Sequence, residues 1–266
     1  MRRYASFVAL AALAFAQAAQ AQRDPNNPTC PQNPGWSLNR QMTFTPQQAG
    51  GRNVLVAEGF IDDNLVPRLE AALRDNPQAE ELWLRSPGGN ARVGNQAGRI
   101  IREAGIPTRI PNGYACFSAC NFLFMGGIAR FVDNGGLFIV HMFTHTNNRE
   151  VIRQEVAQGE DNTIGLIGEI EQQSALLASE DNDFLIRMGV SRNLLTEVMY
   201  RTSAVQDARN RETRRCLTQQ EVNRYNVATT PWRGAEATPR GGGSPGNAGS
   251  SASRSAEPVQ DGKGEK

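Results

Sequence analysis

The sequence predicts an α/β fold in a single domain of about residues 51–230. Within this range, short runs of apolar and β-branched residues alternate with longer stretches whose apolar residues recur at three- and four-residue steps. This alternation is typical of βαβ units. Residues 22–50 are rich in Pro, Asn and Gln, so we expect an extended lead-in there.

The first half of the domain predicts three strands and two helices. Each strand is a short apolar run, and each helix has apolar residues on one face. The strands are "NVLVAEGFI" (53–61), "ELWLRSPGG" (81–89) and "IPTRIP" (106–111), and the helices are "NLVPRLEAALRD" (64–75) and "ARVGNQAGRIIREAG" (91–105). Gly105 is expected to end the second helix.

The second half predicts further helices and a pair of strands about the turn at residues 133–136. The segments are a buried helix "NFLFMGG" (121–127), the strand pair "ARFVDNGGLFIVHMF" (129–143), a helical region of roughly residues 149–188, and a last helix "LTQQEVNRY" (217–225). In the last helix, Thr218 and Glu221 have the spacing of a capping box.

Both ends of the chain predict segments outside the domain. Residues 1–21 carry two arginines, a short apolar stretch and then Ala-Gln-Ala, which predicts a removable secretory signal and a periplasmic or secreted protein. No later segment has the roughly 20 apolar residues that a transmembrane helix needs. Residues 231–266 have too few apolar residues to offset their ordering entropy, so we expect a disordered low-complexity tail.

Charge and composition exclude some chemistries. The formal net charge is +1, so nothing indicates a nucleic-acid partner held by phosphate neutralisation. The only lysines are Lys263 and Lys266, in the tail. Arginine does not lose its proton in proteins, so the predicted domain has no lysine-type base. We expect no cofactor.

The segment "YACFSACNFLFMGG" (114–127) places Ser118 before an apolar run and leaves two interpretations open. Serine is a favoured helix N-cap, and in that role it is inert. Serine is also a nucleophile when a base takes its proton. The chain has two histidines, His141 and His145, both in "VHMFTH". His141 ends an apolar strand and is the better candidate, whereas His145 lies beyond it in a polar loop.

The stretch "SPGGN" supplies a possible third component. Gly88 and Gly89 follow a predicted strand, and glycines let backbone amides approach a ligand closely, as an oxyanion hole requires. An ordinary strand-to-helix turn would use the same residues.

The order of these motifs resembles that of the Clp protease proteolytic subunit and its relatives in the ClpP/crotonase superfamily. The similarity covers about residues 54–143 and includes "GFIDD", the strand that ends in SPGG, the serine before a small-residue helix, and the strand that ends in histidine. The resemblance implies a single ClpP/crotonase-like βαβ superhelix. It also implies Ser118 as nucleophile, His141 as general base, and the amides of Gly88 or Gly89 and of Ala119 as oxyanion donors.

The third member of a triad is unassigned. The family's catalytic aspartate falls near "EVMYRTS" (197–203), where Glu197 is the only carboxylate. The imidazole of His141 could instead be held by a backbone carbonyl, or by Asp207 or Asp183.

The four cysteines leave further alternatives open. Cys116, Cys120, His141 and His145 are zinc-ligand types, although their spacing does not fit a standard finger, and we expect no metal. In an oxidising compartment an even set of cysteines predicts disulfides, with three full pairings possible. We favour Cys116–Cys120 with Cys30–Cys216, because residues four apart in a helix can lie within bridging range.

These observations together predict an exported serine hydrolase, most simply a peptidase with a peptide or protein substrate. The alternative is a catalytically silent binding or scaffold protein on the same fold. The resemblance implies a homo-oligomer, and no ATPase partner is expected where ATP is absent.

Overall fold

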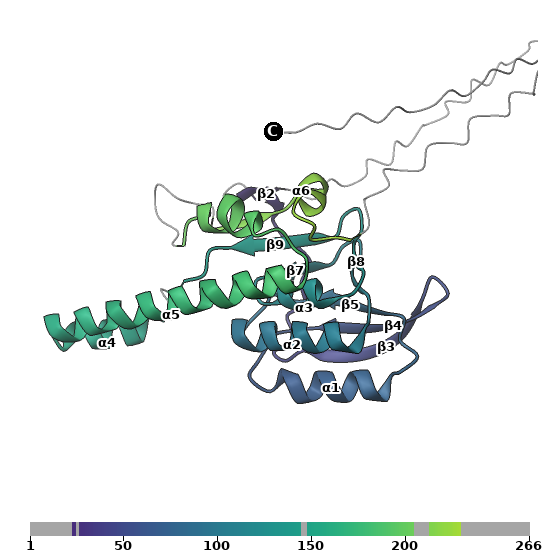
Figure 1. Ribbon diagram of the computed structural model, residues 1–266, viewed down its shortest axis with the longest axis horizontal. Coiled ribbons are helices and arrows are strands. Elements are labelled where there is room, and N and C mark those ends of the chain that lie inside the picture. The colour runs from purple at the N-terminus through teal and green to yellow at the C-terminus, as the bar shows by residue number, and fades with distance from the viewer. Residues whose placement is uncertain (1–22, 25–26, 145–147, 205–212, 230–266) are drawn as a thin grey trace, which may run out of the picture. The chain divides into compact units, whose positions relative to one another are not determined.

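The structure is a computed structural model, and it describes residues 23–24, 27–144, 148–204 and 213–229. The predicted signal segment (1–21) and the predicted tail (231–266) lie outside the described residues. The described chain has the α/β fold that the sequence predicts, with helices between the strands (Figure 1).

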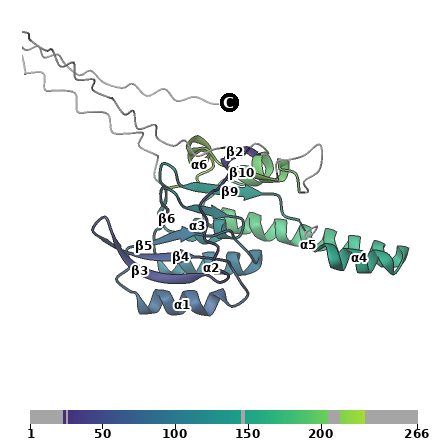
Figure 2. The same cartoon turned by 180° about the vertical axis from the view of Figure 1, so that it is seen from behind.

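One sheet has five strands, with helices in the connections between its parallel strands. They are β3 (Thr43–Ala49), β4 (Arg52–Glu58), β5 (Glu81–Arg85), β6 (Thr108–Ile110) and β8 (Arg130–Val132), with α1 (Leu65–Asp75) and α2 (Ala91–Ala104). The strand order is β3-β4-β5-β6-β8, and only the β3–β4 pair is antiparallel. Helix α2 lies in front of this sheet in Figure 1 and behind it in Figure 2.

Strand β3 is a correction to the predicted lead-in. Its side chains are mostly exposed, so the apolar pattern that predicts a strand is missing. Gly50 and Gly51 have φ of 58° and 77°, and this turn folds β3 back onto β4. Residues 27–31 and 23–24 also form strands, β2 (Asn27–Pro31) and β1 (Arg23–Asp24), which pair with each other.

A second sheet has three strands, β7 (Ala115–Phe117), β9 (Leu137–His141) and β10 (Arg214–Cys216), in the order β10-β9-β7. β7 and β9 are parallel. The two strands predicted about residues 133–136 are therefore not a hairpin, since β8 and β9 belong to different sheets. The two sheets meet where an isolated bridge joins Ser86, just after β5, to Cys116.

The helical region predicted over residues 149–188 is two helices, α4 (Arg149–Ala157) and α5 (Glu160–Arg187). Gly159, with φ of 115°, separates them. In both views α4 lies along the start of α5, away from the two sheets, while the end of α5 reaches them (Figures 1 and 2). None of the helices that the structure describes is long and apolar enough to cross a membrane.

The last described segment returns to the sheets. Helix α6 (Gln219–Arg224) has the predicted capping box between Thr218 and Glu221. Arg130 is 1% exposed, and its guanidinium donates to the carbonyls of Val227, Asn226 and Met188 at 2.6, 2.9 and 3.1 Å. Burial and the charge of Arg102 lower the pKa of Arg130 to about 10. The buried cation thus anchors this segment to β8.

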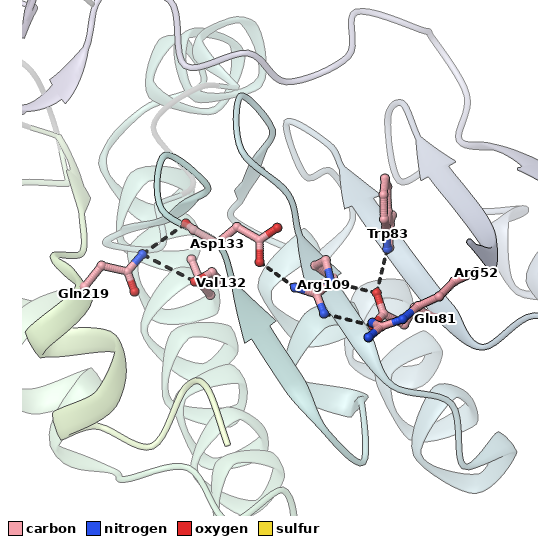
Figure 3. Close-up of polar contacts among 7 residues, drawn as sticks. All are labelled: Arg52, Glu81, Trp83, Arg109, Val132, Asp133 and Gln219. Carbon is pink, nitrogen blue, oxygen red and sulfur yellow. Dashed lines mark hydrogen bonds and ion pairs between the residues drawn. The ribbon is translucent and has the colours of Figure 1, made fainter. Parts of the chain in front are cut away.

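An ionic network crosses the five-stranded sheet (Figure 3). Glu81 accepts hydrogen bonds from Arg109 at 2.7 and 2.9 Å, from Arg52 at 2.5 Å and from the indole of Trp83 at 2.8 Å. Arg109 also donates to Asp133 at 2.5 Å. The network therefore joins β4, β5 and β6 to the turn that leads into the second sheet.

Candidate active site

Ser118 lies in the turn between β7 and α3 (Cys120–Gly126), with φ of 57°. A left-handed φ is uncommon for a residue other than glycine and marks a constrained position. Helix α3 has Ala119 at its N-cap position, and no side chain caps it. The helix-cap interpretation of Ser118 is therefore wrong. The Ser118 Oγ instead lies 2.7 Å from Nε2 of His141.

The parallel pairing of β7 and β9 explains how residues 23 apart in sequence meet. Phe117 is in register with Ile139, so the carboxyl ends of both strands reach the same edge of the sheet. His141 is the last residue of β9, and its ring packs against Phe117 with the ring centroids 4.8 Å apart. The Ser118 amide also donates to the Ile139 carbonyl at 3.3 Å.

Burial lowers the pKa of His141 below its usual value, although a hydrogen bond to the backbone of Met142 opposes this effect. The imidazole is thus held neutral near pH 7, the form that can accept the serine proton. Its hydrogen bond to the Met142 backbone is the kind of support that would orient a ring without a carboxylate.

No carboxylate orients His141 among the residues that the structure describes. Asp183 pairs with Arg99 at 3.1 Å and with Arg187 at 2.9 Å, so the structure does not show the alternative in which Asp183 holds the imidazole. Glu197 accepts from Arg224 at 2.8 Å and from the Tyr225 hydroxyl at 2.9 Å. Asp207 and His145 lie outside the described residues.

The glycine pair packs directly against the Ser118 turn. A Cβ on Gly88 would lie 2.7 Å from Cβ of Ser118 and 2.5 Å from the Phe117 carbonyl oxygen, so only glycine fits there. The Gly88 amide donates to Ser86 Oγ at 3.1 Å and is already satisfied. Of the two glycines that the sequence proposes, Gly89 is the one whose backbone amide has no acceptor among the described residues.

The Gly89 amide is left unused by the backbone pairing beside it. In the bridge between Ile61 and Gly89, the bonds run from Ile61 N–H to Gly88 O and from Asn90 N–H to Ile61 O. Gly89 itself therefore donates nothing to that bridge. The structure likewise assigns the Ala119 amide no hydrogen-bond acceptor within the described chain. The Ala119 amide directly follows Ser118 in the chain, and Gly89 follows Gly88, which packs against the Ser118 turn.

A disulfide encloses this turn. Cys116 and Cys120 are bonded, with their Cα atoms 5.3 Å apart, and Cys30 is bonded to Cys216. The favoured pairing is confirmed, but the first bridge joins a strand to a helix start and not two positions within one helix. Bonded sulfurs are not thiolate ligands, so the zinc alternative loses two of its four ligands. Within the described residues no cluster of His, Cys, Asp and Glu could hold a metal ion.

An apolar pocket opens beside Ser118 and His141. Helix α3 contributes Asn121 to its lining, and α5 contributes Leu177 and Asp181. Asn121 and Asp181 are not among the site residues that the sequence predicts. The sequence does contain a signal for Asp181. This residue falls on the buried face of α5 among apolar residues such as Leu177, and carboxylates are rarely buried without a partner.

The fold and the site together define a class: an α/β domain with a half-buried serine–histidine pair where two sheets meet. No protein-family model matches the chain, and no curated protein matches it. Solved structures do show similarity.

One similar structure is a serine-to-alanine mutant of the 1510-N membrane-bound stomatin-specific protease. It is 15% identical with a TM-score of 0.41, over 64% of this chain and 73% of that chain. A second is an asparagine-to-aspartate mutant of ClpP1 from Listeria monocytogenes. It is 13% identical with a TM-score of 0.42, over 65% of this chain and 87% of that chain. The second belongs by name to the family that the sequence resembles.

Proposed function

We propose that the protein is an exported serine hydrolase of the ClpP-like type that cleaves peptide bonds through an acyl-enzyme. The observation that carries the proposal is the 2.7 Å contact between Ser118 Oγ and His141 Nε2, made by a serine with a left-handed backbone. A serine without a base would be inert, and this contact supplies the base.

The residues suggest a complete reaction. Ser118 Oγ attacks the carbonyl carbon of the scissile bond while His141 Nε2 takes the hydroxyl proton. The negative charge that develops on the carbonyl oxygen is stabilised by the amides of Gly89 and Ala119. His141 then gives its proton to the leaving amine, and the acyl group remains on Ser118. Water, deprotonated by His141, then attacks the acyl carbon; the bond to Ser118 Oγ breaks, His141 returns the proton to this oxygen, and the acid is released.

The setting of the pair supports export. Two disulfides are typical of proteins in oxidising compartments, and the predicted signal at residues 1–21 would deliver the chain there. In such a compartment the enzyme works without an ATPase, on peptides or unfolded segments. As in the family it resembles, the chain forms a homo-oligomer.

One observation favours the alternative of a silent scaffold on the same fold: no carboxylate contacts His141 within the described residues. Labelling with a fluorophosphonate, followed by peptide mapping, separates the two. A catalytic Ser118 is phosphonylated over hours at mildly alkaline pH, and Ser118→Ala is not labelled. The matched control is Ser86, a buried serine that donates to the Gly59 carbonyl at 2.6 Å and should stay unmodified. Folded wild-type protein without any label on Ser118 would favour the scaffold.

A further inference from the structure

The pocket beside Ser118 contains polar atoms that the fold does not satisfy. Asp181 is 8% exposed and Asn121 is 6% exposed, and both line this pocket. The Oδ1 atoms of both side chains are buried and accept no hydrogen bond from any group that the structure describes. A buried acceptor without a donor lowers stability, so such atoms are usually paired in folded proteins.

The orientation of Asn121 is fixed by its neighbours. Its amide Nδ2 donates to the Ile139 carbonyl at 2.8 Å, which leaves Oδ1 as the atom without a partner. Its backbone amide donates to the Ser118 carbonyl at 2.9 Å. The unsatisfied acceptor is therefore tied to the turn that carries the nucleophile.

Asp181 reaches the same pocket from α5. The other residues of its helix that are buried with it, Leu177, Phe184 and Leu185, are apolar. Burial, together with the charge of Glu180, raises the pKa of Asp181 to about 7. Burial and the charge of Asp181 also raise the pKa of Tyr200, and no hydrogen bond from Tyr200 is among the causes that set the pKa of Asp181.

Among the residues that the structure describes, no lysine or arginine lines this pocket, and its remaining walls are mostly aliphatic and aromatic side chains. The two unsatisfied atoms are both acceptors. The complementary group is one that only donates hydrogen bonds and carries positive charge, at the end of an apolar stem. An ammonium has three donors and a guanidinium has five, and neither accepts. Lysine and arginine side chains combine such a head with methylene groups that can lie along apolar walls.

We propose that this pocket is the specificity pocket of the hydrolase and that it takes a lysine or arginine side chain of a peptide substrate, next to the bond that is cleaved. Asp181 pairs with the cationic head, and Asn121 accepts one further hydrogen bond from it. An adjacent cation favours the ionised carboxylate, so binding of the basic side chain supplies the charge partner that the fold lacks. The inference rests on the proposed function, because it specifies the substrate residue whose carbonyl carbon Ser118 attacks.

The test is the rate of covalent modification of Ser118 by two peptidyl diphenyl phosphonates that differ in one side chain. One carries lysine, and the other carries norleucine, which keeps the apolar stem and lacks the ammonium. We expect the wild type to react with the lysine probe at least tenfold faster. Asp181→Asn should reduce this lysine-to-norleucine ratio at least about tenfold. The matched control is Asp183→Asn, which changes a carboxylate two residues along α5 that pairs with arginines outside the pocket and should keep the ratio.

The outcomes separate the two proposals. Modification of Ser118 by the norleucine probe, with a lysine-to-norleucine ratio at or below one in the wild type, would overturn the specificity proposal and leave the hydrolase intact. The specificity proposal also fails if Asp181→Asn, folded by circular dichroism, keeps the wild-type ratio. Failure of both phosphonates and of a small fluorophosphonate to modify folded wild-type Ser118 would instead overturn the proposed function.

Discussion

Cys116 and Cys120 are joined by a disulfide across the turn whose middle residue is Ser118. The bridge links the central residue of β7 to the first residue of α3, so the turn is covalently fixed at both ends. Gly88 packs against the same turn. Because it has no side chain, its backbone can lie directly against Cβ of Ser118. The left-handed backbone of Ser118 is thus held by a bond on one side and by packing on the other.

The two disulfides should differ in their effects on stability and on Ser118. The Cys30–Cys216 bridge closes a loop of 186 residues, and chain entropy gives it about 5 kcal/mol, against about 2 kcal/mol for the four-residue loop of Cys116–Cys120. Urea unfolding of C30A/C216A and C116A/C120A measures the difference. We expect only the second variant to slow phosphonylation of Ser118, by at least tenfold. A larger loss of stability in C116A/C120A than in C30A/C216A would contradict this prediction.

Gly88→Ala should damage the site far more than a matched glycine change elsewhere. Gly51 has a similar φ of 77°, but a methyl group added there would have no atom within 4 Å, whereas a methyl group on Gly88 meets the Ser118 turn. Backbone strain alone costs about 1–2 kcal/mol, and Gly51→Ala measures that cost. The free energy of unfolding of Gly88→Ala should fall by at least about 2 kcal/mol more, and its Ser118 should react poorly with the probe. Equal effects of the two variants would show that Gly88 does not support the turn.

Glu81 should make the protein more stable as the pH rises from the acid range. Burial alone would raise the pKa of Glu81, but hydrogen bonds from Arg109 and Trp83 and the charges of Arg109 and Arg52 hold it below the usual 4.5. A lowered pKa in the folded state means that the stabilisation is complete above about pH 4.5 and is lost as the pH falls through the folded pKa. Urea titrations between about pH 3 and 7 should show a shallower acid decline in Glu81→Gln than in the wild type. Parallel curves would assign the decline to other carboxylates.

The pH dependence of Ser118 labelling should report His141. The base is active when neutral, and burial lowers its pKa below 6.5. The rate of phosphonylation, corrected for hydrolysis of the probe, should therefore rise with pH and reach a plateau with a midpoint below 6.5. A midpoint above about 7 would mean that the ring is more solvated, or more strongly stabilised as a cation, than its surroundings in the structure imply.

Much of the site is predictable from sequence for a specific reason. The chain has only two histidines, and a histidine at the end of an apolar strand is placed at a sheet edge, which is where His141 meets Ser118. The strand β3 is not predictable in this way, because a glycine turn and pairing with β4 form it without an apolar face. Strand β10 is not predictable from its own residues either, because it forms by pairing with β9 and is held by the disulfide from Cys216 to Cys30.

The roles of Asp181 and Asn121 are also not evident from sequence patterns, although the apolar neighbours of Asp181 in α5 mark it as an unusual position. Both are ordinary residues within helical segments, and their roles follow from atoms left without partners once the chain has packed. The choice between Gly88 and Gly89 likewise needs the hydrogen bond from the Gly88 amide to Ser86. Patterns of apolar residues specify elements, whereas unsatisfied donors and acceptors depend on the contacts between them.

The most direct test of the central claim is the rate at which Ser118 is phosphonylated in three proteins: the wild type, His141→Ala and His145→Ala. Each should be folded by circular dichroism, with modification of Ser118 followed by mass spectrometry at about pH 8, where a histidine base is neutral. If His141 is the base, its loss should slow labelling by at least about a hundredfold, which is the usual contribution of general-base catalysis, and the loss of His145 should change the rate less than about threefold. Labelling of His141→Ala at the wild-type rate would contradict the account, because the 2.7 Å contact would then have no part in activating Ser118.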